Sequence, residues 1–357
     1  MEMIYTYALK EPLKTTNGGN CKWGLAEKGK KTYFIKELLS PVYPLDDCGL
    51  SAKAIEKKRK YCETFEQRQS LVYKQLNQHS NGALQKIEEF FRYGSRYYVV
   101  TQQIEALPPS IITDRSFTQE DRERVCLVLM HALAGMHEAG LIHGDIKLDN
   151  ILFYKTAQGF VSAKIIDFED AFMKNESPEP GEEIRGDQIY LSPEAFRLMT
   201  GEPLKLTQAI DVYALGLAMY QILSGSTQIM KGQAHTYPFE ELLGGGELAL
   251  GWNGISNKFA DCIRKMILSI PENRPALSDT LHELQGDIPE ELPPVPPKPP
   301  KEEHVKPGDT PGGSRGRSER YHVGGQTLIS SMGKRTSGKK EEPKTEEKSF
   351  FKKAEDL

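Results

Sequence analysis

The chain has 357 residues, of which 38% are hydrophobic and 27% are charged, and its formal net charge is -4. A compact core usually holds ~100 to 150 residues, so this length predicts two lobes or domains. The composition excludes a collagen, a coiled coil and a wholly disordered chain, and the balanced charge predicts binding to neither nucleic acid nor a membrane surface.

The first ten residues carry Glu2 before any basic side chain and contain no small-residue cleavage site, so we expect no secretory signal. No stretch reaches the ~18 uncharged apolar residues of a membrane helix, and residues 212–223 are instead typical of a buried helix. The five cysteines form no CxxC pair, which argues against a disulfide framework or a zinc ribbon. We therefore expect a cytoplasmic protein with reduced thiols.

Up to about residue 105, the pattern is typical of strands with one long helix between them. Residues 31–36 and 97–100 are rich in aromatic and β-branched types, which favour strands. Residues 51–78 have helical spacing, and the side chains expected to face inward are Cys62, Phe65, Gln69, Val72 and Leu76. Residues 1–105 are thus predicted to form a small β-rich lobe.

From about residue 106 the pattern becomes helical. Thr118 and Asp121 predict the N-terminal cap of a helix that carries Leu129, Leu133 and Met136 on one stripe and ends at Gly140. Residues 106–286 are therefore predicted to form a larger, mainly α-helical lobe. Together the two parts predict an α+β fold with two lobes.

Residues 287–357 differ in composition from the rest. These 71 residues contain 10 of the 22 prolines, 14 Lys or Arg and 13 Asp or Glu, so they bury too little apolar surface to offset the entropy cost of ordering. We expect a disordered tail that begins with a polyproline-like run at residues 293–300. The PxxPxK spacing of Pro293, Pro296 and Lys298 is compatible with a docking peptide or with a spacer.

The densest chemical signal lies at residues 143–152 and 164–169. Its chemistry-bearing positions are, in order, His143, Asp145, Lys147, Asn150, Asp167 and Phe168. This pattern resembles the catalytic and metal-binding loops of the protein kinase superfamily, with Gly144 and Glu169 as substitutions. The resemblance implies ATP and Mg2+ as cofactors.

The same resemblance implies a role for each of these residues. Asp145 is expected to be the base for a substrate hydroxyl, and Lys147 to neutralise the γ-phosphate, as in serine/threonine kinases. Asn150 and Asp167 are expected to hold Mg2+. His143 and Phe168 are expected to belong to the structural part of the motif.

A nucleotide site is expected upstream of the catalytic loop. Lys36 resembles the strand lysine that pairs the phosphates and a helix glutamate, and Glu66, beside the buried stripe, is its expected partner. The turn before Lys36 is a degenerate match to the glycine loop of the family. The positions expected at the nucleotide are Gly18, Gly19 and Trp23 in the turn and Thr101, Gln102, Gln103 and Ile104 in the hinge.

Two branches of the superfamily compete. The His-Gly-Asp and Asp-Phe-Glu motifs also resemble aminoglycoside and choline phosphotransferases, which act on small molecules. Three later positions, Glu194, Asp211 and Arg274, resemble protein kinases instead. There the resemblance implies a buried ion pair between Glu194 and Arg274, and an anchor for the catalytic loop at Asp211.

Several departures from the family bear on regulation. Gly144 replaces the arginine that reads a phosphorylated activation loop, which predicts constitutive or partner-set activity. Asp187 stands where serine/threonine kinases carry a Thr, and either pairs with Lys147 or repels Asp145. Glu169 replaces a permissive glycine, so flipping of this loop is expected to be harder.

These observations predict a serine/threonine protein kinase, with a pseudokinase scaffold and a small-molecule phosphotransferase as alternatives. The His-Gly-Asp form resembles bacterial signalling kinases, which implies a phosphatase or a phosphopeptide-binding domain as partner. Possible autophosphorylation sites in the tail are Thr310, Ser318, Thr336, Ser337 and Thr345. An inert, solubilising tail is the alternative.

Overall fold

The computed structural model describes residues 2–15, 21–46, 48–80, 82–182, 184, 186–229 and 237–285. Gly18, Gly19 and the predicted tail at 287–357 lie outside the described residues.

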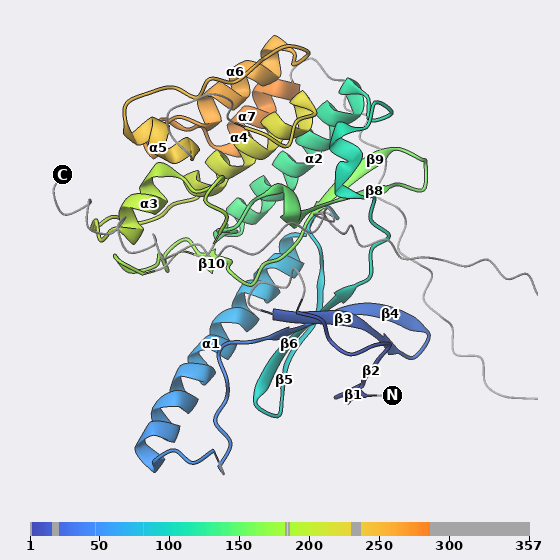
Figure 1. Ribbon diagram of the computed structural model, residues 1–357, viewed down its shortest axis with the longest axis vertical. Helices are drawn as coiled ribbons and strands as arrows, with labels where there is room; N and C mark the ends of the chain where they lie inside the picture. The colour runs from blue at the N-terminus through green and yellow to red at the C-terminus, as the bar shows by residue number, and fades with distance from the viewer. Residues whose placement is uncertain are drawn as a thin grey trace, which may run out of the picture. The chain divides into compact units, whose positions relative to one another are not determined.

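Six antiparallel strands form one sheet in the order β1-β2-β3-β4-β6-β5 (Figure 1). Their bounds are β1 Met3–Ile4, β2 Tyr7–Leu9, β3 Cys21–Lys28, β4 Lys31–Leu38, β5 Ile87–Tyr93 and β6 Arg96–Gln102. One face packs a small apolar core of Ile4, Tyr7, Leu9, Ala26, Ile35, Tyr98 and Val100. The strands predicted at residues 31–36 and 97–100 are confirmed as parts of β4 and β6.

The register of the sheet determines which side chains share its other face. Trp23 lies opposite Lys36 across β3 and β4, and Phe34 lies opposite Thr101 across β4 and β6. Because side chains alternate along a strand, these four residues are on the same side of the sheet. This side faces the helical lobe, since Lys36 contacts residues of that lobe.

One long helix, α1 (Ala52–His79), connects β4 to β5. Ser51 caps it, because the Ser51 hydroxyl accepts a hydrogen bond from the Ala54 N–H. Its buried residues are Cys62, Gln69, Val72, Tyr73 and Leu76, while Phe65 is half-buried. The predicted inward stripe is therefore confirmed.

The second lobe is mainly helical, and its helices are α2 Gln119–Glu138, α3 Pro193–Met199, α4 Ala209–Ser224, α5 Pro238–Leu243, α6 Asn257–Met266 and α7 Leu277–Gln285. Its short strands are β7 Leu141–Ile142, β8 Ile151–Lys155, β9 Val161–Ile165 and β10 Phe172–Met173. Its 3-10 turns are η1 Pro109–Thr113, η2 Leu148–Asn150 and η3 Pro271–Asn273. Thr118 caps α2 as predicted, and α4 contains the buried stretch at 212–223. One apolar core joins α1, β6 and the helical lobe. The predicted two-lobed α+β fold is confirmed.

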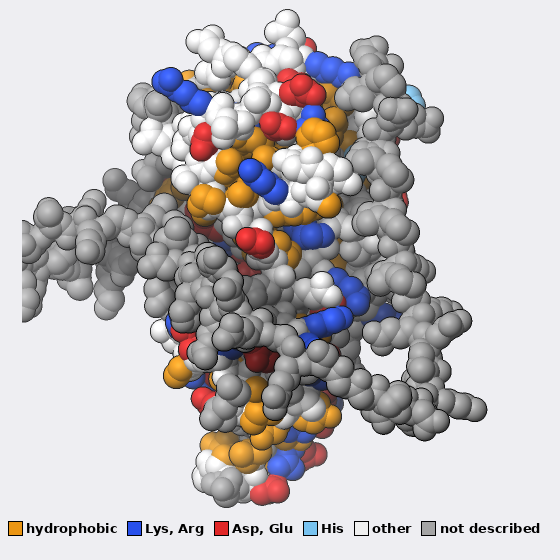
Figure 2. All heavy atoms as spheres, turned by 90° about the vertical axis from the view of Figure 1, so that its right-hand side faces the viewer, with side chains coloured by type: hydrophobic (Ala, Val, Ile, Leu, Met, Phe, Trp, Pro, Cys, Tyr) orange, Lys and Arg blue, Asp and Glu red, His pale blue; other side chains and the backbone are white. Residues whose placement is uncertain are grey.

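The surface carries charges of both signs. On the face drawn in Figure 2, Lys and Arg side chains alternate with Asp and Glu side chains over both lobes, in keeping with the net charge of -4. Among the described residues, none of the helices has both the length and the apolar composition that crossing a bilayer requires.

Candidate active site

A buried aspartate anchors the loop that follows β7. Asp211, in the first turn of α4, is 1% exposed, and its carboxylate accepts hydrogen bonds from the backbone N–H groups of His143 (2.7 Å) and Gly144 (2.9 Å). His137 Nε2 lies 3.0 Å from the same carboxylate. Burial alone raises the pKa of Asp211, but the hydrogen bonds from His137 and His143 outweigh it and hold this pKa below its usual value. The predicted anchoring contact is therefore present.

Gly144 suits the backbone conformation of this loop. Its φ is 79°, and a Cβ atom at this position would lie 3.2 Å from the carbonyl oxygen of Asp170. An L-residue adopts this conformation only with strain, whereas glycine adopts it freely. The substitution noted in the sequence thus relieves strain immediately before Asp145.

Asp145, Lys147 and Asn150 form one hydrogen-bonded group. Lys147 Nζ lies 2.6 Å from Asp145 Oδ2, and Asn150 Nδ2 donates to both the backbone oxygen and Oδ2 of Asp145 at 2.8 Å. Asn150 is buried, whereas the side chains of Asp145 and Lys147 are 11% and 22% exposed. The structure therefore brings together three residues that the sequence predicted to act together, with the carboxylate accessible from outside.

His143 and Phe168 connect this loop to the loop after β9. His143 Nε2 lies 3.1 Å from the carbonyl oxygen of Ile166, and the rings of His143 and Phe168 are 5.2 Å apart between centroids. Both residues are buried. Their contacts therefore pack the two loops against each other.

Lys36 extends from β4 to the helical lobe. Its Nζ lies 2.8 Å from Asp167 Oδ1 and 3.1 Å from Glu169 Oε2, and its side chain is 15% exposed. Asp167 has φ 68°, a conformation that residues other than glycine rarely adopt. The loop that carries Asp167 and Glu169 thus presents two carboxylates to one amine.

The predicted pair between Lys36 and Glu66 is wrong for this structure. Within the described residues, the ion pairs of Lys36 are with Asp167 and Glu169, while Glu66 Oε2 lies 3.5 Å from the Tyr97 hydroxyl. Glu66 and Gln69 lie one turn apart on nearly the same side of α1, but the Glu66 carboxylate turns to Tyr97. Gln69 is the residue of α1 that reaches the loop, because its Nε2 donates to the backbone oxygen of Glu169 at 3.0 Å. The inward stripe already contained Gln69, but its neutral side chain was not read as functional.

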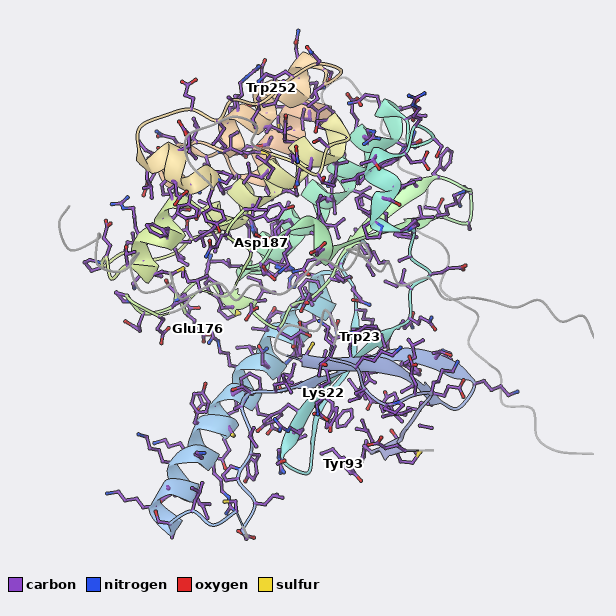
Figure 3. The ribbon with its side chains drawn as sticks, viewed as in Figure 1. Lys22, Trp23, Tyr93, Glu176, Asp187 and Trp252 are labelled. Atoms are coloured by element: carbon purple, nitrogen blue, oxygen red, sulfur yellow. The ribbon has the colours of Figure 1, made fainter. Side chains whose placement is uncertain are left out.

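Two aromatic rings lie on the side of the sheet that carries Lys36. Trp23 and Phe34 stack with ring centroids 5.5 Å apart and planes at 22°, and Figure 3 shows Trp23 on the side of the sheet that faces the helical lobe. Trp23 was predicted to lie at the nucleotide, whereas Phe34 was missed. The sequence position of Phe34, two residues before Lys36, could have identified it, because side chains two apart on a strand share one face.

The predicted hinge follows β6. Thr101 is 7% exposed, and its hydroxyl accepts a hydrogen bond from Gln85 Nε2 at 3.0 Å. The same amide donates to the carbonyl oxygen of Gln102 at 3.3 Å. Gln103 and Ile104 continue the chain outside regular secondary structure. Gln85, which the sequence did not single out, therefore braces Thr101 and Gln102 at the start of this segment.

The donor set of Asn150 and Asp167 fits Mg2+. Because Asn150 Nδ2 donates to Asp145, the amide oxygen is the atom that Asn150 offers to a cation. Mg2+ commonly takes one or two protein oxygens and completes its shell with phosphate oxygens and water. Among the described residues, no cluster of three or more His, Cys, Asp or Glu side chains could hold a metal ion.

The predicted pair between Glu194 and Arg274 is formed. Arg274 Nη1 and Nη2 lie 2.6 Å and 2.9 Å from the two carboxylate oxygens of Glu194, and both side chains are buried. Arg274 also donates to the carbonyl oxygens of Leu268 and Ala209. This pair joins α3 to the segments around α4 and η3, away from Asp145.

Asp187 lies in the segment before α3 (Figure 3). Its Oδ1 accepts a hydrogen bond from the Ile189 N–H at 2.9 Å, so it closes a local turn. In the described chain, Lys147 forms its ion pair with Asp145 and not with Asp187.

Comparison with known proteins gives one family. The family model described as "Protein kinase domain" matches residues 46–284, which is 239 of the 357 residues. The match includes α1 and the helical lobe with Asp145, Asn150 and Asp167. Lys36 precedes the matched range.

Curated proteins are similar to the chain at low identity. "Ribosomal protein S6 kinase alpha-6" of Mus musculus is 27% identical over 246 residues, which cover 65% of this chain and 30% of that protein. "Ovarian-specific serine/threonine-protein kinase Lok" of Drosophila melanogaster is 26% identical over 175 residues, which cover 48% and 35%. "Serine/threonine-protein kinase H1 homolog" of Danio rerio is 28% identical over 194 residues, which cover 53% and 44%. The chain thus spans less than half the length of these relatives.

Proposed function

The chain belongs to the protein kinase family, and from this premise we propose that it is a signalling kinase that transfers the γ-phosphoryl group of ATP to serine or threonine hydroxyls of proteins. The observation that carries the proposal is the contact of both Lys147 and Asn150 with the carboxylate of Asp145. It supports the proposal because phosphoryl transfer requires a base, a cation and a metal-binding group close together.

In the proposed reaction, Asp145 accepts the proton of the substrate hydroxyl while the hydroxyl oxygen attacks the γ-phosphorus. The bond between this phosphorus and the oxygen that bridges to the β-phosphate breaks, and ADP leaves. Lys147 stabilises the negative charge of the transferring group, and Lys36 contacts the α- and β-phosphates. Asn150 and Asp167 would hold Mg2+, which would supply further charge neutralisation at the phosphates.

Two structural contacts support a protein substrate over a small alcohol. The buried pair of Glu194 and Arg274 and the anchor at Asp211 are both formed, and these are the positions in which the sequence resembles protein kinases. Two of the similar proteins are named as serine/threonine kinases. Lys147, two residues after Asp145, supports serine and threonine as acceptors.

The proposal extends to organisation and regulation. Residues 1–105 and 106–286 act as the two lobes of the kinase, and residues 287–357 act as a tail that carries sites for autophosphorylation and for a phosphopeptide-binding partner. Activity is constitutive or set by a partner, because Gly144 replaces the usual receiver of a phosphorylated loop.

The test is the intact mass of the full chain after incubation with ATP and Mg2+, for wild type, Asp145→Asn, Asp167→Asn and Asp149→Asn. Asp149 is exposed and lies in the same loop, so its variant is a matched control. We expect phosphorylation of wild type and Asp149→Asn, a rate ~10² to 10⁴ lower for Asp145→Asn, and almost none for Asp167→Asn. Equal rates in all four proteins would exclude this active site.

A scaffold without transfer is the second candidate, and the stacked pair of Trp23 and Phe34 favours it. Both rings lie on the side of the sheet where the nucleotide base is expected, so they reduce the room for it. Calorimetric titration of wild type and Phe34→Ala with ADP separates the candidates. Binding only after truncation supports the scaffold, whereas wild-type binding together with phosphorylation supports the kinase.

A further inference from the structure

Lys36 receives its carboxylate partners from the loop after β9. Asp167 and Glu169 lie 2.8 Å and 3.1 Å from its Nζ, and the side chains of Lys36 and Glu169 are 15% and 18% exposed. The contact between Lys36 and Glu169 joins residues 133 positions apart in the chain. The two ion pairs therefore couple β4 of the sheet directly to the loop that carries the proposed metal ligand.

The helix that faces this loop supplies no charge to Lys36. The buried positions of α1 are Cys62, Gln69, Val72, Tyr73 and Leu76, and none of them is a carboxylate. Gln69 contacts the loop with a neutral amide, which donates to the backbone oxygen of Glu169 at 3.0 Å and lies 3.4 Å from the Tyr73 hydroxyl. The amide thus holds the backbone of Glu169, whose side chain holds Lys36.

Asp167 alone is a poor lasting partner for Lys36. It is also a proposed ligand of Mg2+, and a divalent cation on its carboxylate repels a nearby ammonium group. Mg2+ bound to Asp167 would weaken the contact between Lys36 and Asp167, and Glu169 would then be the carboxylate left at Lys36. Without Glu169, the amine would compete with Mg2+ for Asp167.

We propose that Glu169 is the positioning residue for Lys36, replacing the helix glutamate expected in this family, and that Gln69 fixes its backbone. The inference rests on the proposed function for the identity of the nucleotide and the metal. The proposal thus assigns a role to Glu169, which stands in place of the glycine of the family's Asp-Phe-Gly motif. The proposal also explains why Lys36 still has a carboxylate partner although Glu66 of α1 is turned toward Tyr97.

The test measures ADP binding to the full chain by calorimetric titration across a series of Mg2+ concentrations. The variants are Glu169→Gln, which removes the charge but keeps the shape, Glu169→Asp, which keeps the charge, and Glu66→Gln as the matched control on α1. Melting temperatures without nucleotide check that each variant is folded. Because Glu169 is partly exposed, its amide variant is expected to fold.

For Glu169→Gln we expect an ADP affinity about tenfold lower at limiting Mg2+ and a higher Mg2+ concentration for half-saturation. A tenfold change in affinity corresponds to ~1.4 kcal/mol. Glu66→Gln is expected to stay within about twofold of wild type, and Glu169→Asp within about threefold, because a carboxylate remains near Lys36. A loss in Glu66→Gln with none in Glu169→Gln overturns the proposal. Equal losses in Glu169→Asp and Glu169→Gln overturn it as well, because charge then plays no part.

These outcomes separate the inference from the proposed function. ADP binding requires no phosphoryl transfer. If wild type binds ADP and Glu169→Gln binds it more weakly, but neither is phosphorylated, the role of Glu169 stands and the kinase proposal fails. If wild type is phosphorylated and Glu169→Gln matches it in both binding and rate, the kinase proposal stands and the role of Glu169 fails.

Discussion

An ion pair in the sheet lobe and one in the helical lobe differ sharply in burial. In the sheet lobe, Lys10 pairs with Glu27 while their side chains are 43% and 45% exposed, whereas in the helical lobe Arg274 and Glu194 pair at 0% and 5% exposure. An exposed pair contributes ~0–1 kcal/mol, while removing one partner of a buried pair costs ~3–5 kcal/mol. The Arg274–Glu194 pair therefore uses charge to hold backbone segments of the helical lobe together, whereas the Lys10–Glu27 pair adds little to the stability of the sheet lobe.

The strongest challenge to this comparison is Arg274→Met. It leaves the Glu194 carboxylate buried without its partner, so we expect the free energy of unfolding to fall by ~3–5 kcal/mol. Lys10→Met, the control in the sheet lobe, is expected to change it by less than ~1 kcal/mol. Urea unfolding of both variants measures the difference. Similar losses in the two would show that burial does not distinguish these pairs.

Asp211→Asn removes another buried charge of the helical lobe. An asparagine oxygen accepts from one of the N–H groups of His143 and Gly144, but its NH2 group then faces the other. Hydrogen bonds to a charged group contribute ~1.5–3 kcal/mol each, so we expect a loss of at least ~1.5 kcal/mol at neutral pH.

The pH dependence of this loss identifies its cause. The pKa of Asp211 in the folded protein lies below its usual value, and the unfolded value is ~3.9. The stabilisation is therefore complete above the unfolded pKa and disappears as the pH falls through the folded pKa. The difference between wild type and Asp211→Asn in urea unfolding should shrink below pH ~4. A difference that stays constant there would assign the loss to packing rather than to charge.

The sequence predicted the helical half of the site better than the sheet half, and the reason is distance along the chain. Asp145, Lys147 and Asn150 lie within six residues, so their spacing nearly determines their contacts. The partner of Lys36 depends on which face of α1 meets a loop 100 residues later, as the contact between Gln69 and Glu169 shows. Helical periodicity identified the buried face of α1 but not which of its residues would reach that loop.

Gly144→Ala tests the loop that Asp211 anchors, with Gly159→Ala as its control. Both glycines have positive φ, 79° and 88°, so alanine costs ~1–2 kcal/mol of strain at either position. Only at Gly144 would the new Cβ meet another group, the carbonyl oxygen of Asp170 at 3.2 Å.

We therefore expect a stability loss in urea unfolding that is at least as large for Gly144→Ala as for Gly159→Ala, and a difference in activity. Gly144→Ala should lower the phosphorylation rate by at least about tenfold, because a shift of Asp145 spoils its alignment with the substrate. Gly159→Ala should leave the rate unchanged. Equal rates in the two would show that the loop accommodates the methyl group without moving Asp145.

The smallest effect is expected at Ser177, a hydroxyl in the acidic segment between β10 and α3. Its Oγ accepts a hydrogen bond from the Leu206 N–H at 2.9 Å and donates to the carbonyl oxygen of Pro178 at 3.3 Å, so it serves the local fold. Ser177→Ala should reduce the free energy of unfolding by ~1 kcal/mol, more than Ser226→Ala, which removes a hydrogen bond in an exposed turn. Because Gly144 removes the usual receiver of a phosphorylated loop, the phosphorylation rate of Ser177→Ala should equal that of wild type. A loss beyond about tenfold would show that this serine controls activity. The acidic segment would then have a regulatory role even though position 144 carries no arginine to receive a phosphate.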